Sequence, residues 1–180
     1  KFKDKNILKI KVFILTLFFF SITVEPDCNS TASIPKHKTE NKISKFDMAV
    51  ELIKQKEGWH DRRHKYYVGY GHRLLKSDTF NHDISEEFAD SLLRKDLLQK
   101  CSVFRKYGKD SLILGVLAYN VGEYNILGYK NKPASWLIRK IRSGNRDFYK
   151  EYVSFCRYKN KVIPSIRQRR KDEFELLYVK

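Results

Sequence analysis

Apolar side chains recur at helical intervals along most of the chain after residue 44. Phe46, Ala49 and Ile53 are three or four residues apart, which is the spacing of one face of an amphipathic helix. This face ends at Glu57, which a glycine follows, and glycine is common just after the last residue of a helix. The pattern therefore predicts a first helix that begins near Ser44 and ends at Glu57.

The same spacing predicts further helices. Ser85 is a typical N-cap residue, and the apolar positions after it, among them Leu92 and Leu97, share one face. The segment 112–121 is apolar nearly all round, which indicates a buried central helix. Three more helices are predicted at 136–144, 147–158 and 164–177.

A different pattern occupies residues 58–75. Here Val68 and Tyr70 alternate with Gly69 and Gly71, which predicts a short β region with glycines where the backbone must bend or approach a neighbour. The resulting fold class is α+β: a mainly helical domain with one small β-hairpin near its start and a helical C-terminal lobe.

The beginning of the sequence differs in character from this domain. Residues 1–11 are rich in lysine and precede an apolar run at 12–24, the arrangement of a secretory signal. The run is shorter than the ~20 residues of a spanning helix, but the absence of a clear cleavage site leaves an uncleaved anchor open. We expect a signal or anchor at 1–27, a polar linker at 28–43 and the folded domain at 44–180. From this signal we expect the protein to be exported to the periplasm or cell envelope.

The chain carries a net charge of +16. Without the first 28 residues, which hold five lysines and three acids, the net charge is still +14, from 32 basic and 18 acidic side chains. The folded part therefore favours an anionic partner: nucleic acid, a membrane surface or an acidic wall polymer. Export and the lack of a nucleic-acid motif speak against nucleic acid, and membrane contact is expected only through the N-terminal segment.

Three cysteines, Cys28, Cys101 and Cys156, show no metal-ligand spacing, and we expect no metal or other cofactor. Cys101 and Cys156 fall on apolar helix faces, which favours buried free thiols over a disulfide. Lipidation of Cys28 remains open, although the residues before it do not match the small side chains expected there.

The order of motifs resembles a known family. Glu57-Gly58 is followed by Gly69-Tyr70-Gly71-His72, and further similar stretches are Leu92-Leu93-Arg94-Lys95-Asp96, Ala118-Tyr119-Asn120-Val121-Gly122, and Pro164 with Arg169-Arg170-Lys171-Asp172-Glu173. This set is similar to the phage-type, T4-lysozyme-like lysozymes of glycoside hydrolase family 24 over roughly residues 46–177. The short interval from Glu57 to His72 marks a divergent sub-branch with a shortened active-site hairpin.

The resemblance implies catalytic roles for residues of the hairpin. Glu57 is the general acid, expected to be desolvated by the aromatic strand and by Trp59 so that it stays protonated. Asp61 is the available second carboxylate, with an ion pair to Arg62 or Arg63 as the alternative. Tyr67 stands where the family has a threonine, and it either orients water or stacks on a sugar.

Other positions match supporting roles in the family. Tyr70 and Asn120 are expected to bind substrate, and Arg169 to support the catalytic glutamate from behind. His72 is expected to form a structural ion pair with Asp96 rather than to act as a base. For Trp136, by its residue type, packing in the core is expected rather than service as a platform for a sugar ring.

These expectations define a peptidoglycan-cleaving muramidase that acts as a monomer on glycan strands. It cleaves the linkage between N-acetylmuramic acid and N-acetylglucosamine. Two alternatives stay open. A lytic transglycosylase needs only one acid, because a hydroxyl of the sugar replaces water. A non-catalytic wall-binding module would keep the scaffold without the chemistry.

Overall fold

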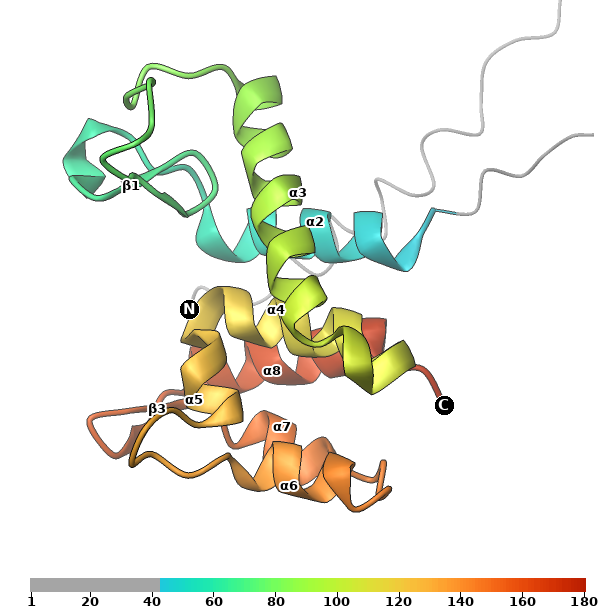
Figure 1. The fold of residues 1–180 in the computed structure, drawn as a ribbon. Helices are drawn as coiled ribbons and strands as arrows, with labels where there is room; N and C mark the ends of the chain where they lie inside the picture. The colour runs from blue at the N-terminus through green and yellow to red at the C-terminus, as the bar shows by residue number, and fades with distance from the viewer. Residues whose placement is uncertain (1–42) are drawn as a thin grey trace, which may run out of the picture. The chain divides into compact units, whose positions relative to one another are not determined.

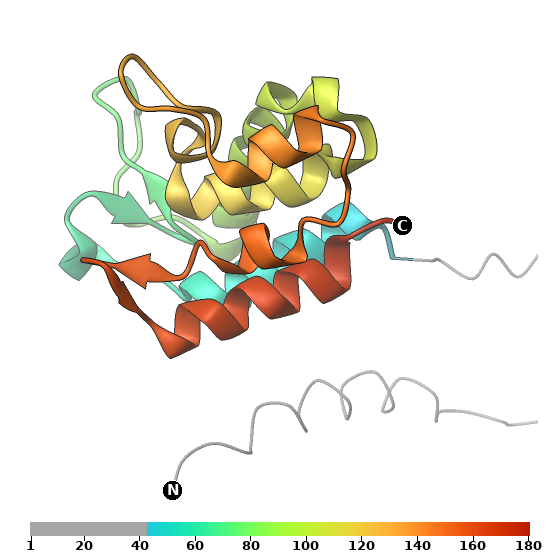
Figure 2. The ribbon, with the colours of Figure 1, turned by 90° about the horizontal axis from the view of Figure 1, so that it is seen from below.

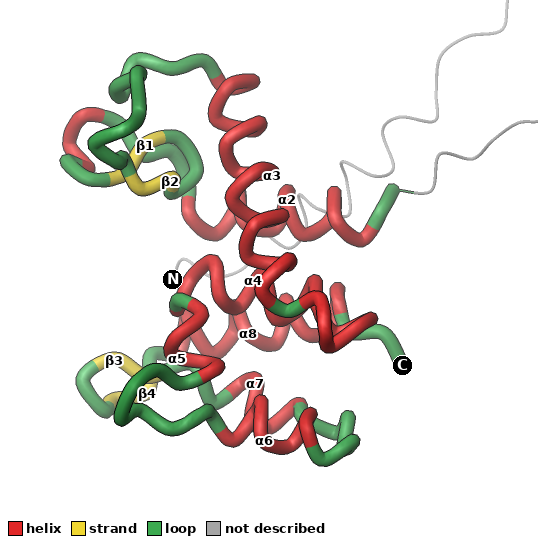
Figure 3. Tube along the Cα trace, viewed as in Figure 1, coloured by secondary structure: helices red, strands yellow, loops and turns green. Residues whose placement is uncertain are grey.

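Helices make up most of residues 43–180, the part of the chain that the computed structural model describes (Figure 1). The strands are confined to two short hairpins (Figure 3). The predicted α+β, mainly helical class is confirmed. The expected signal or anchor and nearly all of the linker lie outside the described residues. No helix within 43–180 has the length and apolar character needed to cross a membrane.

The helices and strands follow the chain in a simple order. The α-helices are α2 (Lys45–Glu57), α3 (Glu86–Val103), α4 (Ser111–Val121), α5 (Glu123–Leu127), α6 (Trp136–Arg142), α7 (Tyr149–Val153) and α8 (Pro164–Leu177). Two 3₁₀ turns, η2 (Arg62–His64) and η3 (Arg105–Asp110), join them. The strands are β1 (Tyr67–Val68), β2 (His72–Arg73), β3 (Arg157–Tyr158) and β4 (Lys161–Val162).

Serine side chains fix the starts of three helices. The hydroxyl of Ser44 accepts from the amide of Asp47 at 3.1 Å, and Ser85 caps α3 and Ser135 caps α6 in the same way. Such a cap satisfies an amide that has no partner within the helix and contributes about 1 kcal/mol. The predicted starts of the first two helices are therefore confirmed.

The core is centred on α4. Ile113, Leu114 and Leu117 of this helix are buried and pack against apolar side chains of α3, including Leu93 and Leu97. α8 runs alongside α2, and both contact α4 (Figure 2). The prediction of a central buried helix is confirmed, and this packing places the ends of α2, α4 and α8 together.

A glycine lets α3 and α4 approach closely. A Cβ atom added at Gly115 of α4 would lie 2.5 Å from Sγ of Cys101 and 3.0 Å from that residue's backbone on α3. Both described cysteines, Cys101 and Cys156, are free thiols as predicted. Burial raises the pKa of the Cys101 thiol to about 11, so this side chain acts as an apolar spacer.

The first hairpin returns the chain to the end of α2. Val68 pairs with His72, and His60 and Gly69 exchange backbone hydrogen bonds of 2.7 and 3.1 Å. Gly69 has a φ of 59°, and a Cβ there would lie 2.7 Å from Cβ of Ala89 on α3. The hairpin can therefore rest on α3 only because this position has no side chain.

The predicted helix at 147–158 is wrong over its second half. α7 ends at Val153, and Arg157–Tyr158 pairs with Lys161–Val162 in a second hairpin. Phe148 and Tyr152 are buried, as the helical spacing predicts. Lys159 and Asn160, however, both have positive φ values, 47° and 64°, which close a two-residue hairpin turn, and the strand before this turn occupies the residues predicted as the end of the helix.

The expectation that Trp136 packs in the core is also wrong. Its side chain is 72% exposed, because α6 is short and buries Leu137 and Ile138 instead. The guanidinium of Arg139 lies 3.9 Å from the centre of the indole ring.

We predict that Gly115→Ala destabilises the domain by about 1–2 kcal/mol, because the added methyl forces α3 and α4 apart and this outweighs the better helix propensity of alanine. Chemical denaturation measures the loss. In the double variant with Cys101→Ala the loss should be smaller than the sum of the single effects, since the nearest atom is gone. Strict additivity of the two changes would contradict the close contact.

Candidate active site

Glu57 is the last residue of α2, at the point where the helix meets the first hairpin. The amide of Gly58, which has a φ of 69°, closes the helix on the carbonyl of Lys54. A Cβ added at Gly71 of the hairpin would lie 3.8 Å from Cγ of Glu57. The Glu57 side chain is 20% exposed, so it is partly enclosed but still reaches the surface.

Two side chains from other helices contact one oxygen of Glu57. Nη1 of Arg169, on α8, lies 2.7 Å from Oε1, and Nδ2 of Asn120, on α4, donates to the same atom at 3.4 Å. Arg169 thus lies against the glutamate, where the resemblance placed it, and the substrate-binding role expected of Asn120 stays a prediction. Among the described residues, neither contact involves Oε2, which leaves that oxygen available.

A buried carboxylate holds Arg169 in place. Glu173 is 1% exposed, and it accepts from Nε of Arg169 at 2.9 Å. Nη1 of Arg170 donates to both of its oxygens, at 2.7 and 2.5 Å, and the hydroxyl of Tyr152 donates at 2.9 Å. Arg170 also donates to Oδ1 of Asn120. The two arginines, Glu173 and Asn120 therefore form one network that ends at Glu57.

The charges of this network balance when Glu57 is ionised, as it is after giving up a proton. Burial alone lowers the pKa of Arg169, but the negative charges of Glu57 and Glu173 outweigh it and raise that pKa above its usual value. Tyr152 is fully buried, and burial followed by the nearby Glu173 carboxylate raises its pKa well above the usual range. Its hydroxyl therefore stays a hydrogen-bond donor.

Glu173 is the functional position that sequence reasoning missed. It stands in the run Arg169-Arg170-Lys171-Asp172-Glu173, three and four residues after the two arginines. Residues at these intervals share a face of a helix, so an acid there can pair with both arginines. That spacing was the available signal.

The surroundings of Glu57 differ from the apolar pocket expected from the sequence. Trp59 is 42% exposed, and its ring meets Tyr70 edge-on at 5.5 Å between centroids. Polar contacts from Arg169 and Asn120, rather than aromatic desolvation, define the environment of the acid.

Asp61 forms the ion pair that the sequence left as an alternative to catalysis. Its carboxylate accepts from Nε and Nη2 of Arg63 at 2.9 and 2.6 Å and caps η2, while Arg62 pairs with Asp83 instead. Hydrogen bonds from Arg63 hold the pKa of Asp61 well below its usual range. The catalytic role of Asp61 stays a prediction.

Two tyrosines of the hairpin have different environments. Tyr67 is exposed on β1, with its ring 6.0 Å from that of His60. Tyr70 is only 9% exposed and its hydroxyl donates to Glu86 at 2.7 Å. Burial and this bond raise the pKa of Tyr70 to about 12. Its ring packs in the core, and the substrate-binding role expected for this side chain stays a prediction.

His72 ties the hairpin to α3, as predicted. Its Nδ1 lies 2.6 Å from Oδ2 of Asp96, and its Nε2 lies 3.3 Å from Oδ2 of Asp78. Asp78 also accepts from the amide of Leu75, which is the main reason why its pKa is lowered. Both ring nitrogens thus face carboxylates, and the ring is largely enclosed. Within 43–180, no group of three or more His, Cys, Asp or Glu side chains is placed to hold a metal ion.

An acid at the junction of a helix and a glycine-rich hairpin, backed by an arginine from the last helix, defines a lysozyme-like site. The phage lysozyme family matches residues 54–173, a span that begins just before Glu57 and ends at Glu173. The chain belongs to this family, whose members cleave peptidoglycan, a polymer that lies outside the cytoplasm.

One solved structure supports the same fold. The muramidase domain of SpmX from Asticaccaulis excentricus superposes with a TM-score of 0.54 at 21% sequence identity. The match covers 74% of this chain and 96% of that one. No curated protein matches the chain.

We predict that Asp96→Asn lowers stability by about 1–3 kcal/mol, because it weakens a partly buried, charge-assisted contact to His72. Since the pair holds the hairpin rather than the reacting atoms, kcat should change less than about threefold. Asp147→Asn, at an exposed position, is the matched control. Lost turnover with an unchanged melting temperature would contradict a structural role.

We predict that Glu173→Gln costs about 3–5 kcal/mol, because it leaves the buried guanidinium of Arg170 without a carboxylate and that of Arg169 with Glu57 alone. Glu175→Gln, two residues further along the same helix but exposed, should change stability very little. Thermal and urea unfolding of both variants measure the difference. Equal melting temperatures would show that the network does not stabilise the fold.

Proposed function

We propose that this protein hydrolyses the linkage between N-acetylmuramic acid and N-acetylglucosamine in peptidoglycan, with Glu57 as the general acid. The observation that carries the proposal is the geometry of the Glu57 carboxylate. Arg169 and Asn120 hold Oε1, whereas Oε2 forms no hydrogen bond or ion pair with the other described residues. One oxygen is thus fixed and the other is available for the glycosidic oxygen.

This arrangement suits the delivery of a proton. As the glycosidic bond breaks, Glu57 gives its proton to the leaving oxygen and becomes a carboxylate. Arg169 lies 2.7 Å away and stabilises the negative charge that develops. Glu173 and Arg170 keep the guanidinium of Arg169 in place, so it needs little reorganisation during the reaction. They act as positioning residues.

Hydrolysis also requires a group that activates water on the other face of the sugar. The resemblance to inverting enzymes assigns this role to Asp61, whose carboxylate would stand roughly 6.5–9.5 Å from that of Glu57 in the working complex. Its partner Arg63 is highly exposed, and exposed ion pairs are weak enough to be exchanged when substrate binds. The exposure of Tyr67 on β1 supports a contact between this side chain and the substrate.

A lytic transglycosylase is the second candidate, and one observation favours it. The bidentate contact with Arg63 occupies Asp61, and its lowered pKa makes it a weak base. A reaction that uses a hydroxyl of the sugar instead of water would need only Glu57.

The charge of the folded part and the N-terminal segment support a site of action at the cell wall. The folded part carries +14, which suits an anionic wall polymer, and the N-terminal segment directs the chain to the periplasm or cell envelope. We propose that it acts there as a monomer, contacts the membrane only through that segment and does not bind nucleic acid.

Glu57→Gln should reduce kcat by about 10²–10⁴, because the amide cannot supply the proton. The decrease in turbidity of purified cell walls and the release of new reducing ends both report it. Glu51→Gln, an exposed change on the same helix, is the control and should retain full activity. Equal rates for the two variants would remove Glu57 as the acid and favour a non-catalytic wall-binding module.

Mass spectrometry of the products tests the second half of the reaction. We expect hydrolysed reducing ends, and we expect Asp61→Asn to lower kcat by more than about tenfold, as loss of a general base does. Arg63→Ala, which frees Asp61, should retain activity. Anhydro ends, together with an unaffected Asp61→Asn variant, would establish the transglycosylase instead.

A further inference from the structure

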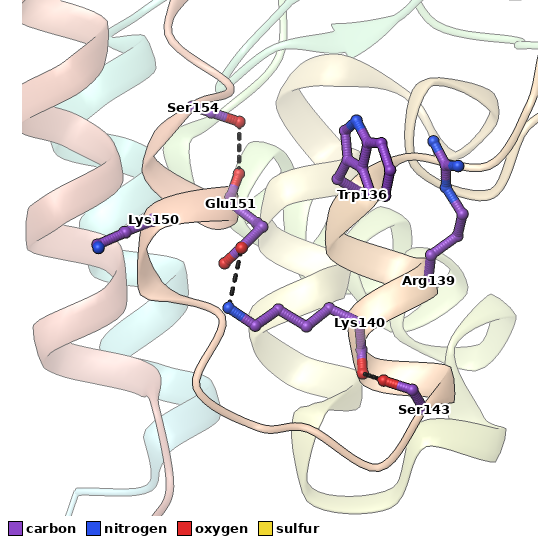
Figure 4. A pocket seen from close by; sticks show the side chains of 7 residues that line it. All are labelled: Trp136, Arg139, Lys140, Ser143, Lys150, Glu151 and Ser154. Atoms are coloured by element: carbon purple, nitrogen blue, oxygen red, sulfur yellow. Dashed lines mark hydrogen bonds and ion pairs between the residues drawn. The ribbon is translucent and has the colours of Figure 1, made fainter.

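Two adjoining pockets lie on a part of the surface that the reaction does not use. The first, of about 540 Å³, is formed by α6 and α7, with Trp136, Arg139 and Glu151 among its lining residues (Figure 4). The second, of about 400 Å³, is formed by α7, the second hairpin and α8. Lys150 and Ser154 line both pockets, so the two form one continuous surface. We call it the α6–α8 surface.

This surface is separated from Glu57 by the core. α8 contacts both α2 and α7, and Figure 1 shows α4 and α8 between α2 and the pair of helices α6 and α7. The sequence of α8 explains how one helix contributes to both the active-site network and the α6–α8 surface. Arg169 and Glu173 are four residues apart and point to the active-site network, while Arg167 and Lys171, also four apart, lie on the opposite side of the helix.

One end of the α6–α8 surface presents a flat aromatic side chain. Trp136 is 72% exposed, and Arg139 lies against its ring at 3.9 Å. Exposing an indole to water is unfavourable unless a ligand covers it, and tryptophan and arginine are the residues most enriched at binding hot spots. A single exposed apolar residue is common in proteins and does not by itself indicate a binding site. The exposed indole indicates one only because a pocket lies beside it.

The other end is strongly basic. Lys150, Arg157, Arg167 and Lys171 line the second pocket, which has no acidic residue in its wall. Within residues 43–180, none of these four cations forms an ion pair with a carboxylate, whereas Lys54, Arg94, Lys100 and Arg146 elsewhere in the fold all do. The one acid of the first pocket, Glu151, is neutralised by Lys140 at 2.9 Å.

We propose that the α6–α8 surface is a second, non-catalytic binding site for an anionic polysaccharide of the cell wall. A sugar ring stacks on Trp136, and acidic groups further along the strand bind the cations of the second pocket. The concave shape fits a strand rather than a flat bilayer. The proposal rests on the proposed function only in that the cell wall is where the chain acts. The α6–α8 surface holds the enzyme on the wall while the side of the molecule that carries Glu57 stays open to substrate.

Binding to insoluble walls tests the proposal without any catalysis. In a chain that carries Glu57→Gln, the walls stay intact, and sedimentation gives the Kd. Trp136→Ala and the pair Arg167→Gln with Lys171→Gln should each weaken binding about tenfold, the effect of losing one or two direct contacts. The control pair Arg105→Gln with Lys106→Gln removes the same charge from exposed positions of η3 and should bind as before.

The same substitutions in a chain with Glu57 separate this proposal from the proposed function. Cleavage of short soluble glycan fragments should be unchanged, because these fragments need only the active site. Melting temperatures should be unchanged because Trp136 and Arg167 are exposed and the half-buried Lys171 forms no ion pair within residues 43–180. Removal of phosphate-bearing polymer from the walls by acid identifies the source of the charge. If the Kd then rises to that of the variants, the phosphates are the ligand; if it stays the same, the carboxylates of peptidoglycan are. Equal Kd values for the Trp136 variant, the basic-pair variant and the control pair would overturn the proposal.

Discussion

The ion pairs of one buried carboxylate, Glu173, connect most of the structure. It lies between Arg169 and Arg170 on its own helix and accepts from Tyr152 on α7, while Arg170 reaches Asn120 on α4 and Arg169 reaches Glu57 on α2. Four helices are therefore joined by charges that would be costly to bury singly. Removing any one of them leaves an unpaired group, so the site and the fold depend on the same contacts. The position of the Glu57 carboxylate depends on this arrangement.

Much of the fold follows from local signals. Serine caps and three- to four-residue spacing predicted where α2, α3 and α8 lie, since these signals depend only on neighbouring residues. The contacts of His72 with Asp96 and of Arg169 with Glu57 were predicted by the family resemblance. The second hairpin was not, because its turn depends on two residues with positive φ, neither of them glycine. The exposure of Trp136 depends on which face of a short helix the tertiary packing buries, which residue type does not reveal.

The hairpin between Glu57 and His72 is the least determined part of the site. It is short, and it is fixed at its far end by Gly69 against Ala89 and by His72 between Asp96 and Asp78. This leaves the 3₁₀ turn that carries Asp61 as the part with exposed, exchangeable contacts. The sequence identifies Asp61 as the available acid but does not identify its ion-pair partner, because Arg62 and Arg63 both lie close to it along the chain. Only the fold shows that Arg62 pairs with Asp83 and leaves Arg63 for Asp61. Any change of shape on substrate binding would fall on this turn.

The two sides of α8 differ in how they respond to dissolved ions. Arg169, Arg170 and Glu173 are buried, and mobile ions barely screen charges that they cannot approach. Arg167 and Lys171 face solvent, where the Debye length is about 8 Å at physiological ionic strength and shrinks as salt rises. If the α6–α8 surface binds the wall as proposed, ionic strength acts on that attachment and not on the alignment of Glu57. Under that proposal, a change in the ionic strength around the envelope would change how long the protein stays on the wall without disturbing the contacts that align Glu57.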